Sequence, residues 1–160
     1  MKSEVFYCNG LRFSCVRCSL CCRYESGFVF LSEDDLFVLA DALIMKADEF
    51  VAAYCRWIPS EDGYNEELSL KEIPTGSDNF DCVFWKDGCS VYDSRPIQCR
   101  NFPFWDFVLK DEGAWNRTAA GCPGMGKGEL HPFSEIQARL NERREHPVIK
   151  RIKTWTSNSS

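Results

Sequence analysis

The residues with the clearest chemical potential in this chain are four cysteines near its N-terminus. Cys15, Cys18, Cys21 and Cys22 form a Cys-x-x-Cys-x-x-Cys-Cys run. A short loop with sulfur at two-residue intervals can turn several thiolates towards one centre, and thiolates bind zinc, iron and iron–sulfur clusters. The run therefore predicts a metal or cluster site.

Three of these cysteines have the spacing that bacterial ferredoxins use for an iron–sulfur cluster. Such proteins add a thiolate from a distant cysteine that precedes a proline. Cys122 is the one cysteine of this chain followed by proline, although Cys99 can also serve as the remote ligand. We predict that Cys15, Cys18, Cys21 and Cys122 bind a cluster, of the [4Fe–4S] type.

Zinc is the alternative, because tetrahedral thiolate sites are commonly built from Cys-x-x-Cys knuckles. The run supplies one knuckle, but the chain has no second one. Cys82 and Cys89 have six residues between them and flank Lys86-Asp87-Gly88, which is typical of a tight turn. A hairpin there can still bring both thiolates to one ion.

Cys22 needs a separate interpretation, because adjacent side chains on an extended backbone point to opposite sides. It either faces a second site with Cys82, Cys89 or Cys99, or is a plain buried cysteine. In the first case, eight thiolates make two four-ligand centres. The predicted metal ligands are then Cys15, Cys18, Cys21, Cys22, Cys82, Cys89, Cys99 and Cys122.

The other cysteines and both histidines lie outside any ligand spacing. We expect structural roles for Cys8 and Cys55, and exposed or capping roles for His131 and His146. Arg23, Arg95 and Arg100 lie near cysteines in the sequence, where they can stabilise thiolates or form ordinary ion pairs with aspartates.

Composition limits the class of protein and its partners. The 160 residues suffice for one domain with a core. The net charge is -5, and the chain has no basic stripe for nucleic acid. The exception is a cluster of Lys and Arg at 139–153, which we interpret as a solvated face. No stretch is apolar and long enough for a signal peptide or a membrane span. We expect a cytoplasmic protein with no nucleic-acid or membrane partner, whose ten cysteines are mostly reduced.

Hydrophobic periodicity and capping signals predict an α+β fold with short strands, three or four helices and an irregular, cysteine-lined metal centre. We predict one domain over residues 1–160, a cysteine-cluster core over 13–140 and a polar tail over 147–160. The expected elements are strands at 11–14, 27–31 and 68–73, a hairpin at 82–92, and helices at 47–57 and after Ser32, Pro96 and Ser134. Ser32 and Ser134 each begin a capping box.

Four blocks in a fixed order resemble the YkgJ-like cysteine-cluster family, whose members are described as zinc- or iron-chelating or iron–sulfur proteins. The blocks are Cys15-x-x-Cys18-x-x-Cys21-Cys22-Arg23, Cys82-Val83-Phe84 with Gly88-Cys89-Ser90-Val91-Tyr92, Arg95-Pro96-x-x-Cys99-Arg100-x-Phe102-Pro103, and Cys122-Pro123-Gly124-x-Gly126-Lys127-Gly128. The resemblance implies metal ligation by the eight cysteines. A flagellin lysine methylase belongs to the same broad group, which implies that the module can also sit inside a methyl-transfer enzyme.

Three functions follow from these features. The leading hypothesis is a metalloprotein whose iron–sulfur cluster serves electron transfer, redox sensing or a redox-linked reaction. The second is a zinc-binding module without catalytic activity, in which the metal contributes folding free energy. The third is a protein-modifying methyl transferase, although no acid, base or nucleophile constellation stands out beyond the thiols.

Overall fold

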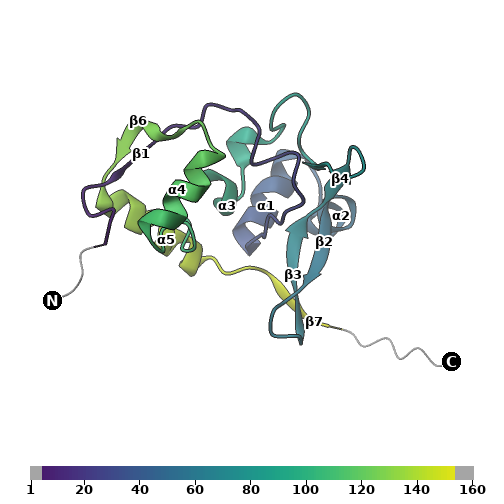
Figure 1. The fold of residues 1–160 in the computed structure, drawn as a ribbon. Helices are drawn as coiled ribbons and strands as arrows, with labels where there is room; N and C mark the ends of the chain where they lie inside the picture. Colours follow the sequence, from purple (N-terminus) through teal and green to yellow (C-terminus); the bar gives the residue numbers. More distant parts are fainter. Residues whose placement is uncertain (1–4, 154–160) are drawn as a thin grey trace.

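The computed structural model describes residues 5–153 and has the α+β fold that the sequence predicts. Within that range, five α-helices and a short 3-10 helix, η1 (Tyr92–Ser94), surround three small antiparallel sheets. Two separate apolar cores divide the molecule into two halves, which Figure 1 shows side by side.

The first half, here called the sheet half, packs two helices on a three-stranded sheet. The helices are α1 (Glu33–Ala42) and α2 (Ala47–Tyr54), and the strands are β2 (Cys55–Pro59), β3 (Asn65–Leu70) and β7 (Lys150–Ile152), in the order β2-β3-β7. Leu39, Phe50 and Leu68 lie in its core and are almost fully buried. Burial of each such side chain stabilises the folded state by about 1.5–3 kcal/mol.

Local signals fix the helices of this half. Ser32 and Asp35 form the predicted capping box, in which the Asp35 N–H donates to Ser32 Oγ and the Ser32 N–H donates to Asp35 Oδ2. The helix predicted over 47–57 ends earlier, at Tyr54, because the chain continues directly into β2, which pairs in register with β3.

A small two-stranded sheet extends the sheet half towards the cysteine-rich loop. It consists of β4 (Glu72–Pro74) and β5 (Phe80–Cys82). The strand predicted at 68–73 is therefore divided at Lys71 between β3 and β4. The segment predicted as a strand at 27–31 forms only an isolated bridge, Phe30 with Ser69, and two backbone hydrogen bonds link its Val29 and Leu31 to β3.

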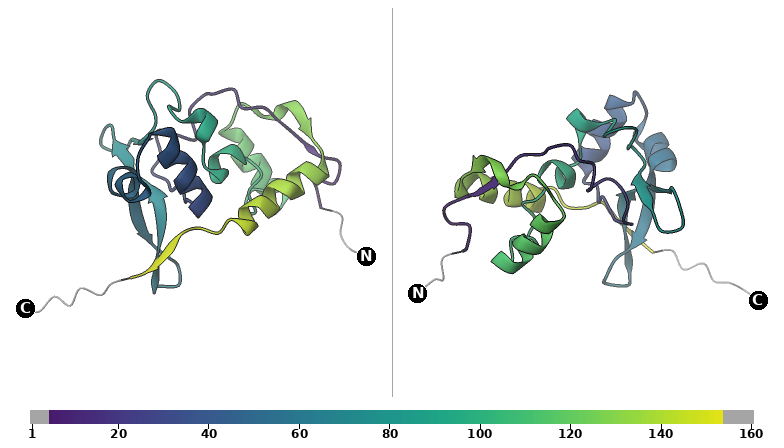
Figure 2. Two further views of the ribbon diagram at one scale, coloured as in Figure 1. Left: turned by 180° about the vertical axis from the view of Figure 1, so that it is seen from behind. Right: turned by 45° about the horizontal axis from the view of Figure 1, so that its top comes forward.

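The second half, here called the helical half, has a core of aromatic and aliphatic side chains that includes Phe104, Val108 and Ile136. Its elements are β1 (Leu11–Phe13), α4 (Glu112–Ala120), β6 (Met125–His131) and α5 (Phe133–Glu145). β1 pairs antiparallel with β6. The one-turn helix α3 (Ile97–Arg100) lies between the two halves, as the view from behind in Figure 2 also shows.

Two predictions about this half need correction or extension. The capping box expected at Ser134 is wrong, because the N-cap of α5 lies two residues earlier, at Pro132, and has no side-chain cap. Helix α4 was not predicted from its polar sequence. It is capped by Asp111, whose carboxylate accepts the Ala114 N–H at 2.7 Å.

The end of the chain differs from the polar tail expected over 147–160. Residues 150–152 form β7, which pairs with β3 from Glu67 to Asn65. Residues 154–160 of that segment lie outside the described residues. In residues 5–153, no helix is long and apolar enough to cross a membrane.

The basic cluster at 139–153 is largely neutralised by carboxylates. Its ion pairs are Arg139 with Glu135, Arg144 with Asp106, Lys150 with Glu67 and Arg151 with Glu66. Paired side chains of this kind form a polar face whose charges largely balance.

Candidate metal centre

The Cys-x-x-Cys-x-x-Cys-Cys run lies on a loop over residues 14–22, here called the thiol loop, which passes from the helical half to the sheet half (Figure 1). The loop contains almost no regular structure. Arg17 and Ser19 adopt positive φ angles of 54° and 67°, a conformation that costs free energy for residues other than glycine. Its shape therefore depends on contacts at its two ends.

At its start, the thiol loop is fixed to β6. The Ser14 N–H donates to the Gly124 carbonyl at 3.2 Å, and Ser14 Oγ accepts the Glu129 N–H at 2.9 Å. A Cβ atom at Gly124 would overlap the Ser14 carbonyl oxygen, so only glycine allows the two backbones to approach this closely. This contact places the Cys15 backbone beside the turn that carries Cys122.

At its other end, the thiol loop is fixed to β5. The Cys82 N–H donates to the Cys22 carbonyl at 2.7 Å. Next to this bond, Arg23 and Asp81 form a backbone bridge and a 3.1 Å ion pair between their side chains. Cys22 and Cys82, 60 residues apart in the printed sequence, are thereby neighbours.

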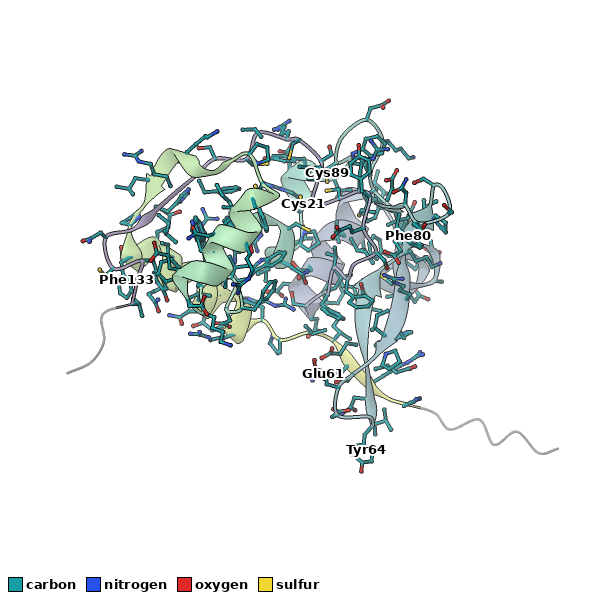
Figure 3. All side chains as sticks on the ribbon, viewed as in Figure 1. Cys21, Glu61, Tyr64, Phe80, Cys89 and Phe133 are labelled. Atoms are coloured by element: carbon teal, nitrogen blue, oxygen red, sulfur yellow. The ribbon has the colours of Figure 1, made fainter. Side chains whose placement is uncertain are left out.

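The predicted turn after β5 brings Cys89 to the same place. Asp87 and Gly88 have φ angles of 51° and 132°, as the Asp-Gly signal requires. The hairpin is shorter than predicted, because its only strand contact is the isolated bridge between Trp85 and Cys89. Figure 3 shows Cys89 next to Cys21 at the junction of the two halves.

Helix α3 contributes Cys99. The helix begins after Pro96, as predicted, and the Ile97 N–H donates to Asp35 Oδ1 at 2.8 Å. Asp35 also belongs to the capping box of α1, so one buried carboxylate fixes both helices. The Cys99 thiol is half-buried between the two halves.

The thiols of Cys21 and Cys22 do not point apart, which corrects the expectation for adjacent cysteines. Their Sγ atoms are 3.8 Å apart. The reason is a turn in which the Cys22 N–H donates to the Ser19 carbonyl, so the backbone here is not extended. Two thiolates bound tetrahedrally to one zinc at about 2.3 Å lie about 3.8 Å apart, so this pair can face one ion or two adjoining ions.

Electrostatic interactions show which thiols are close to this pair. The Cys22 thiol donates a hydrogen bond that lowers the pKa of Cys21 to about 6, and Arg95 lowers it further, against the effect of burial. The pKa of Cys22 is raised by the same hydrogen bond, by burial and by the charges of Cys21, Cys82 and Cys99. One thiolate is therefore favoured in this pair even without metal.

The remaining thiols are near the same cluster. Burial raises the pKa of Cys82, Cys89 and Cys99, and the charge of Cys21 raises each further. Burial also raises the pKa of Cys122, with smaller contributions from the charges of Cys18 and Cys21. Grouped thiols that repel each other as anions are the donor set that a soft cation stabilises.

These contacts define two ends of the centre. The β5 end consists of Cys21, Cys22, Cys82, Cys89 and Cys99. The β6 end consists of Cys15, Cys18 and Cys122, and its two loop cysteines are exposed. Among residues 5–153, no three Cys, His, Asp or Glu side chains already stand at the spacing of a closed metal site.

Cys8 and Cys55 lie outside this centre. Cys55 is buried in the core of the sheet half, where burial raises its pKa to about 12. Cys8 is exposed in the turn before β1. All ten cysteines are free thiols, so no disulfide competes with metal binding.

Both histidines have roles other than ligation. His146 is the C-cap residue of α5, as predicted for a capping residue, and pairs with Asp34 at 2.9 Å. His131 is buried, which corrects the expectation of an exposed or capping side chain. Its ring nitrogens contact Glu135 and the Phe13 carbonyl, each at 2.9 Å, and so connect β6, α5 and β1.

Of the three arginines near cysteines in the sequence, one acts on the thiols. Arg23 pairs with Asp81 and Arg100 pairs with Glu142 at 2.6 Å. Arg95 lowers the pKa of Cys21, Cys89 and Cys99 by its charge. Its guanidinium lies 3.6 Å from the Tyr92 ring centroid.

The donor chemistry of this junction, thiols with a cation beside them, fits zinc or an iron–sulfur centre. The chain matches the CxxCxxCC family, described as "Putative zinc- or iron-chelating domain", over residues 14–123. The protein therefore belongs to the CxxCxxCC family, in agreement with the resemblance seen in the sequence, and the match supports binding of zinc or iron.

A curated relative adds sequence similarity but no function. The chain is 30% identical over 101 residues to Uncharacterized protein MJ0661 of Methanocaldococcus jannaschii. The aligned part covers 61% of this chain and 48% of the relative, so the chain spans about half of that protein's length. No solved structure matches the chain.

Proposed function

We propose that this protein holds an iron–sulfur cluster, of the [4Fe–4S] type, for electron transfer, redox sensing or a redox-linked reaction. The ligands would be Cys15, Cys18 and Cys21 on the thiol loop, with Cys122 as the remote ligand. The main support for the proposal is that the thiol loop is hydrogen-bonded to the chain beside the turn that contains Cys122. In addition, the charges of Cys18 and Cys21 act on the Cys122 thiol.

The protein's own residues supply three conditions for such a cluster. The loop presents thiols at the ferredoxin spacing. Arg95 places a positive charge beside Cys21, which favours the thiolate that metal binding requires. The Gly124 contact holds the two ligand-bearing segments together before the cluster binds. The bound cluster would supply one-electron redox chemistry.

A second centre is proposed at the β5 end. Cys22 interacts with Cys82 and Cys99, and Cys82 interacts with Cys89, so four thiols form one electrostatic group. Four thiols without an open position are typical of structural zinc. If the protein binds metal at the β5 end alone, its function is the second candidate, a zinc module in which the metal stabilises the fold.

The proposed extent of the metal-binding core is residues 13–140, since the ligand segments and the β1–β6 contact fall within this range. Residues beyond it would support the fold without binding metal.

The experiment that tests the proposed function is purification without oxygen, followed by measurement of iron, acid-labile sulfide and zinc per chain. We expect iron and sulfide in similar amounts and a visible sulfur-to-iron absorption band. A colourless protein with stoichiometric zinc and no sulfide would reject the cluster and leave the zinc module. Cys55→Ala is the control, because the charges of the other thiols do not act on this buried thiol.

A further inference from the structure

The thiol loop carries exposed side chains between its cysteines. Val16 is 57% and Leu20 is 47% exposed, and Arg17 between them is also exposed. Single exposed apolar side chains are normal on a protein surface, so the position of these two between the cysteines, and not their exposure alone, is the observation used here. A molecule that contacted these residues would lie within one or two residues of the predicted cluster ligands.

Arg17 is held in a defined place. Its guanidinium lies 3.9 Å from the Tyr92 ring centroid, and the guanidinium of Arg95 lies 3.6 Å from the same centroid. Two guanidinium groups cannot occupy one face of a ring at these distances, so Tyr92 separates them. The charge of Arg95 acts on the thiols, as its effect on the pKa of Cys21 shows. Arg17 is exposed, so its charge is accessible to a partner molecule.

The charge balance around the thiols differs from the rest of the chain. The segments 12–22, 84–95 and 121–128 carry five Lys or Arg and two Asp, whereas acidic residues outnumber basic ones 24 to 19 in the whole chain. None of these five cations forms an ion pair with a carboxylate among residues 5–153. They are Arg12, Arg17, Lys86, Arg95 and Lys127.

The opposite situation holds on α5 and β7. There, four of the five cations pair with a carboxylate of the chain, namely Arg139, Arg144, Lys150 and Arg151. Cations whose charge is not neutralised by a carboxylate of the chain attract an acidic molecule and accelerate its association at low ionic strength. The unpaired cations therefore point to an acidic partner at the thiol loop.

We propose that the thiol loop, with Val16, Leu20 and Arg17 at its centre and Arg12, Lys86 and Lys127 around it, is the docking surface for a small acidic electron-carrier protein. The inference rests on the proposed iron–sulfur function. The carrier's reduced centre loses one electron and the centre on this chain gains it, with no bond made or broken. A small, weak interface is typical of such encounters.

The test uses two readouts on the whole protein, purified without oxygen. The first is binding of a plant-type [2Fe–2S] ferredoxin made redox-silent with gallium, followed by NMR at several salt concentrations. The second is the rate at which the same ferredoxin, iron-loaded and reduced, reduces the protein in a stopped-flow instrument. The variants are Arg17→Glu, the double change Val16→Ser with Leu20→Ser, and Arg144→Glu as a control with the same change in charge.

We expect the wild-type protein to bind the ferredoxin with an affinity that falls as salt rises, because salt screens exposed charges. Arg17→Glu should weaken binding and slow reduction about tenfold at low salt, and Arg144→Glu less than twofold. The Val16 and Leu20 change should weaken binding at every salt concentration. Iron and sulfide content should stay at the wild-type level in all variants.

Two results would overturn different parts of the account. If the protein holds the cluster but Arg17→Glu binds the ferredoxin as tightly as wild type, or no more weakly than Arg144→Glu, the docking surface is wrong. If iron and sulfide are absent, the proposed function on which the docking rests is wrong.

Discussion

The two ends of the thiol loop are held by different means. At the β5 end, five thiols lie near one another, four of them half-buried, and the Cys21 and Cys22 sulfurs are already 3.8 Å apart. At the β6 end, Cys15 and Cys18 are exposed, and a close glycine contact aligns the backbone without closing the site. The difference matches the two proposed centres, a more buried one at the β5 end and a more accessible one at the β6 end.

The largest effect should come from removing a half-buried thiol of the β5 end. Cys99→Ala should release the metal of that end and remove its contribution to the free energy of unfolding, which is about 10 kcal/mol or more for a structural zinc site. Denaturant unfolding with metal analysis measures both quantities. Cys55→Ala removes a buried thiol outside the centre, and its effect should be limited to lost packing; equal metal loss in both variants would contradict the assignment.

Removal of the remote ligand should affect the other end alone. Cys122→Ala should abolish acid-labile sulfide and the visible band, because the cluster would lack one of its four ligands. Stability should fall less than in Cys99→Ala, since Cys122 packs at the edge of the helical core, between the exposed residues Gly121 and Pro123. If Cys99→Ala and Cys122→Ala lost the same metals in the same proportion, the two ends would form a single centre.

The sequence predicts more of the β5 end than of the β6 end. The Asp87-Gly88 turn and Pro96 are strong local signals, and they correctly predict that Cys89 and Cys99 lie at a turn and on a short helix. The contact of Ser14 with Gly124 could not be predicted. It joins segments about 110 residues apart, and it is possible only because glycine has no side chain.

Other differences between the predicted and the observed structure also arise from contacts between distant parts of the chain. The pairing of β7 with β3 overrides a polar sequence that resembles a tail, and α4 forms in a largely polar sequence, where the Asp111 cap marks its start. The orientation of Cys22 depends on the turn at Ser19, whose positive φ angle no residue type signals there. Tertiary contacts decide each of these cases.

The glycine contact offers a way to disturb the β6 end without touching a ligand. Gly124→Ala introduces a Cβ that overlaps the Ser14 carbonyl, and overpacking of this kind costs about 1–3 kcal/mol. We expect lower cluster occupancy and faster loss of iron to a chelator, with the metal of the β5 end retained. Gly121→Ala is the matched control, because its Cβ would lie 3.7 Å from the nearest atom; iron loss as fast as in Gly124→Ala would contradict the proposed role.

The pKa of Cys21 provides a pH test of the β5 end in metal-free protein. Since this pKa is lowered to about 6, the thiolate forms as the pH rises through 6, and alkylation of Cys21 should increase there and level off above pH 7. Mass spectrometry of alkylated peptides measures the rate at each pH. Cys22→Ala removes the S–H donor and should move this increase to higher pH; an unchanged profile would show that the hydrogen bond is not the cause.

The smallest effect should come from the cation beside the thiols. Arg95→Gln should raise the pKa of Cys21, Cys89 and Cys99 and weaken metal binding at neutral pH by about 0.2–1 kcal/mol. Competition with a chelator at several pH values measures this change. Arg100→Gln serves as the control, since Arg100 pairs with Glu142; a larger effect in the control would exclude Arg95 as the relevant cation.

The central claim is that thiols of the loop bind metal together with thiols from distant segments. Crystals grown without oxygen, with the metals located by anomalous scattering at the iron and zinc edges, test it most directly. We expect metal bonded to Cys21 on the loop and to Cys122 from the β6 turn, and a second position among Cys22, Cys82, Cys89 and Cys99. Metal bound to neither set, or loop cysteines joined in disulfides, would contradict the claim.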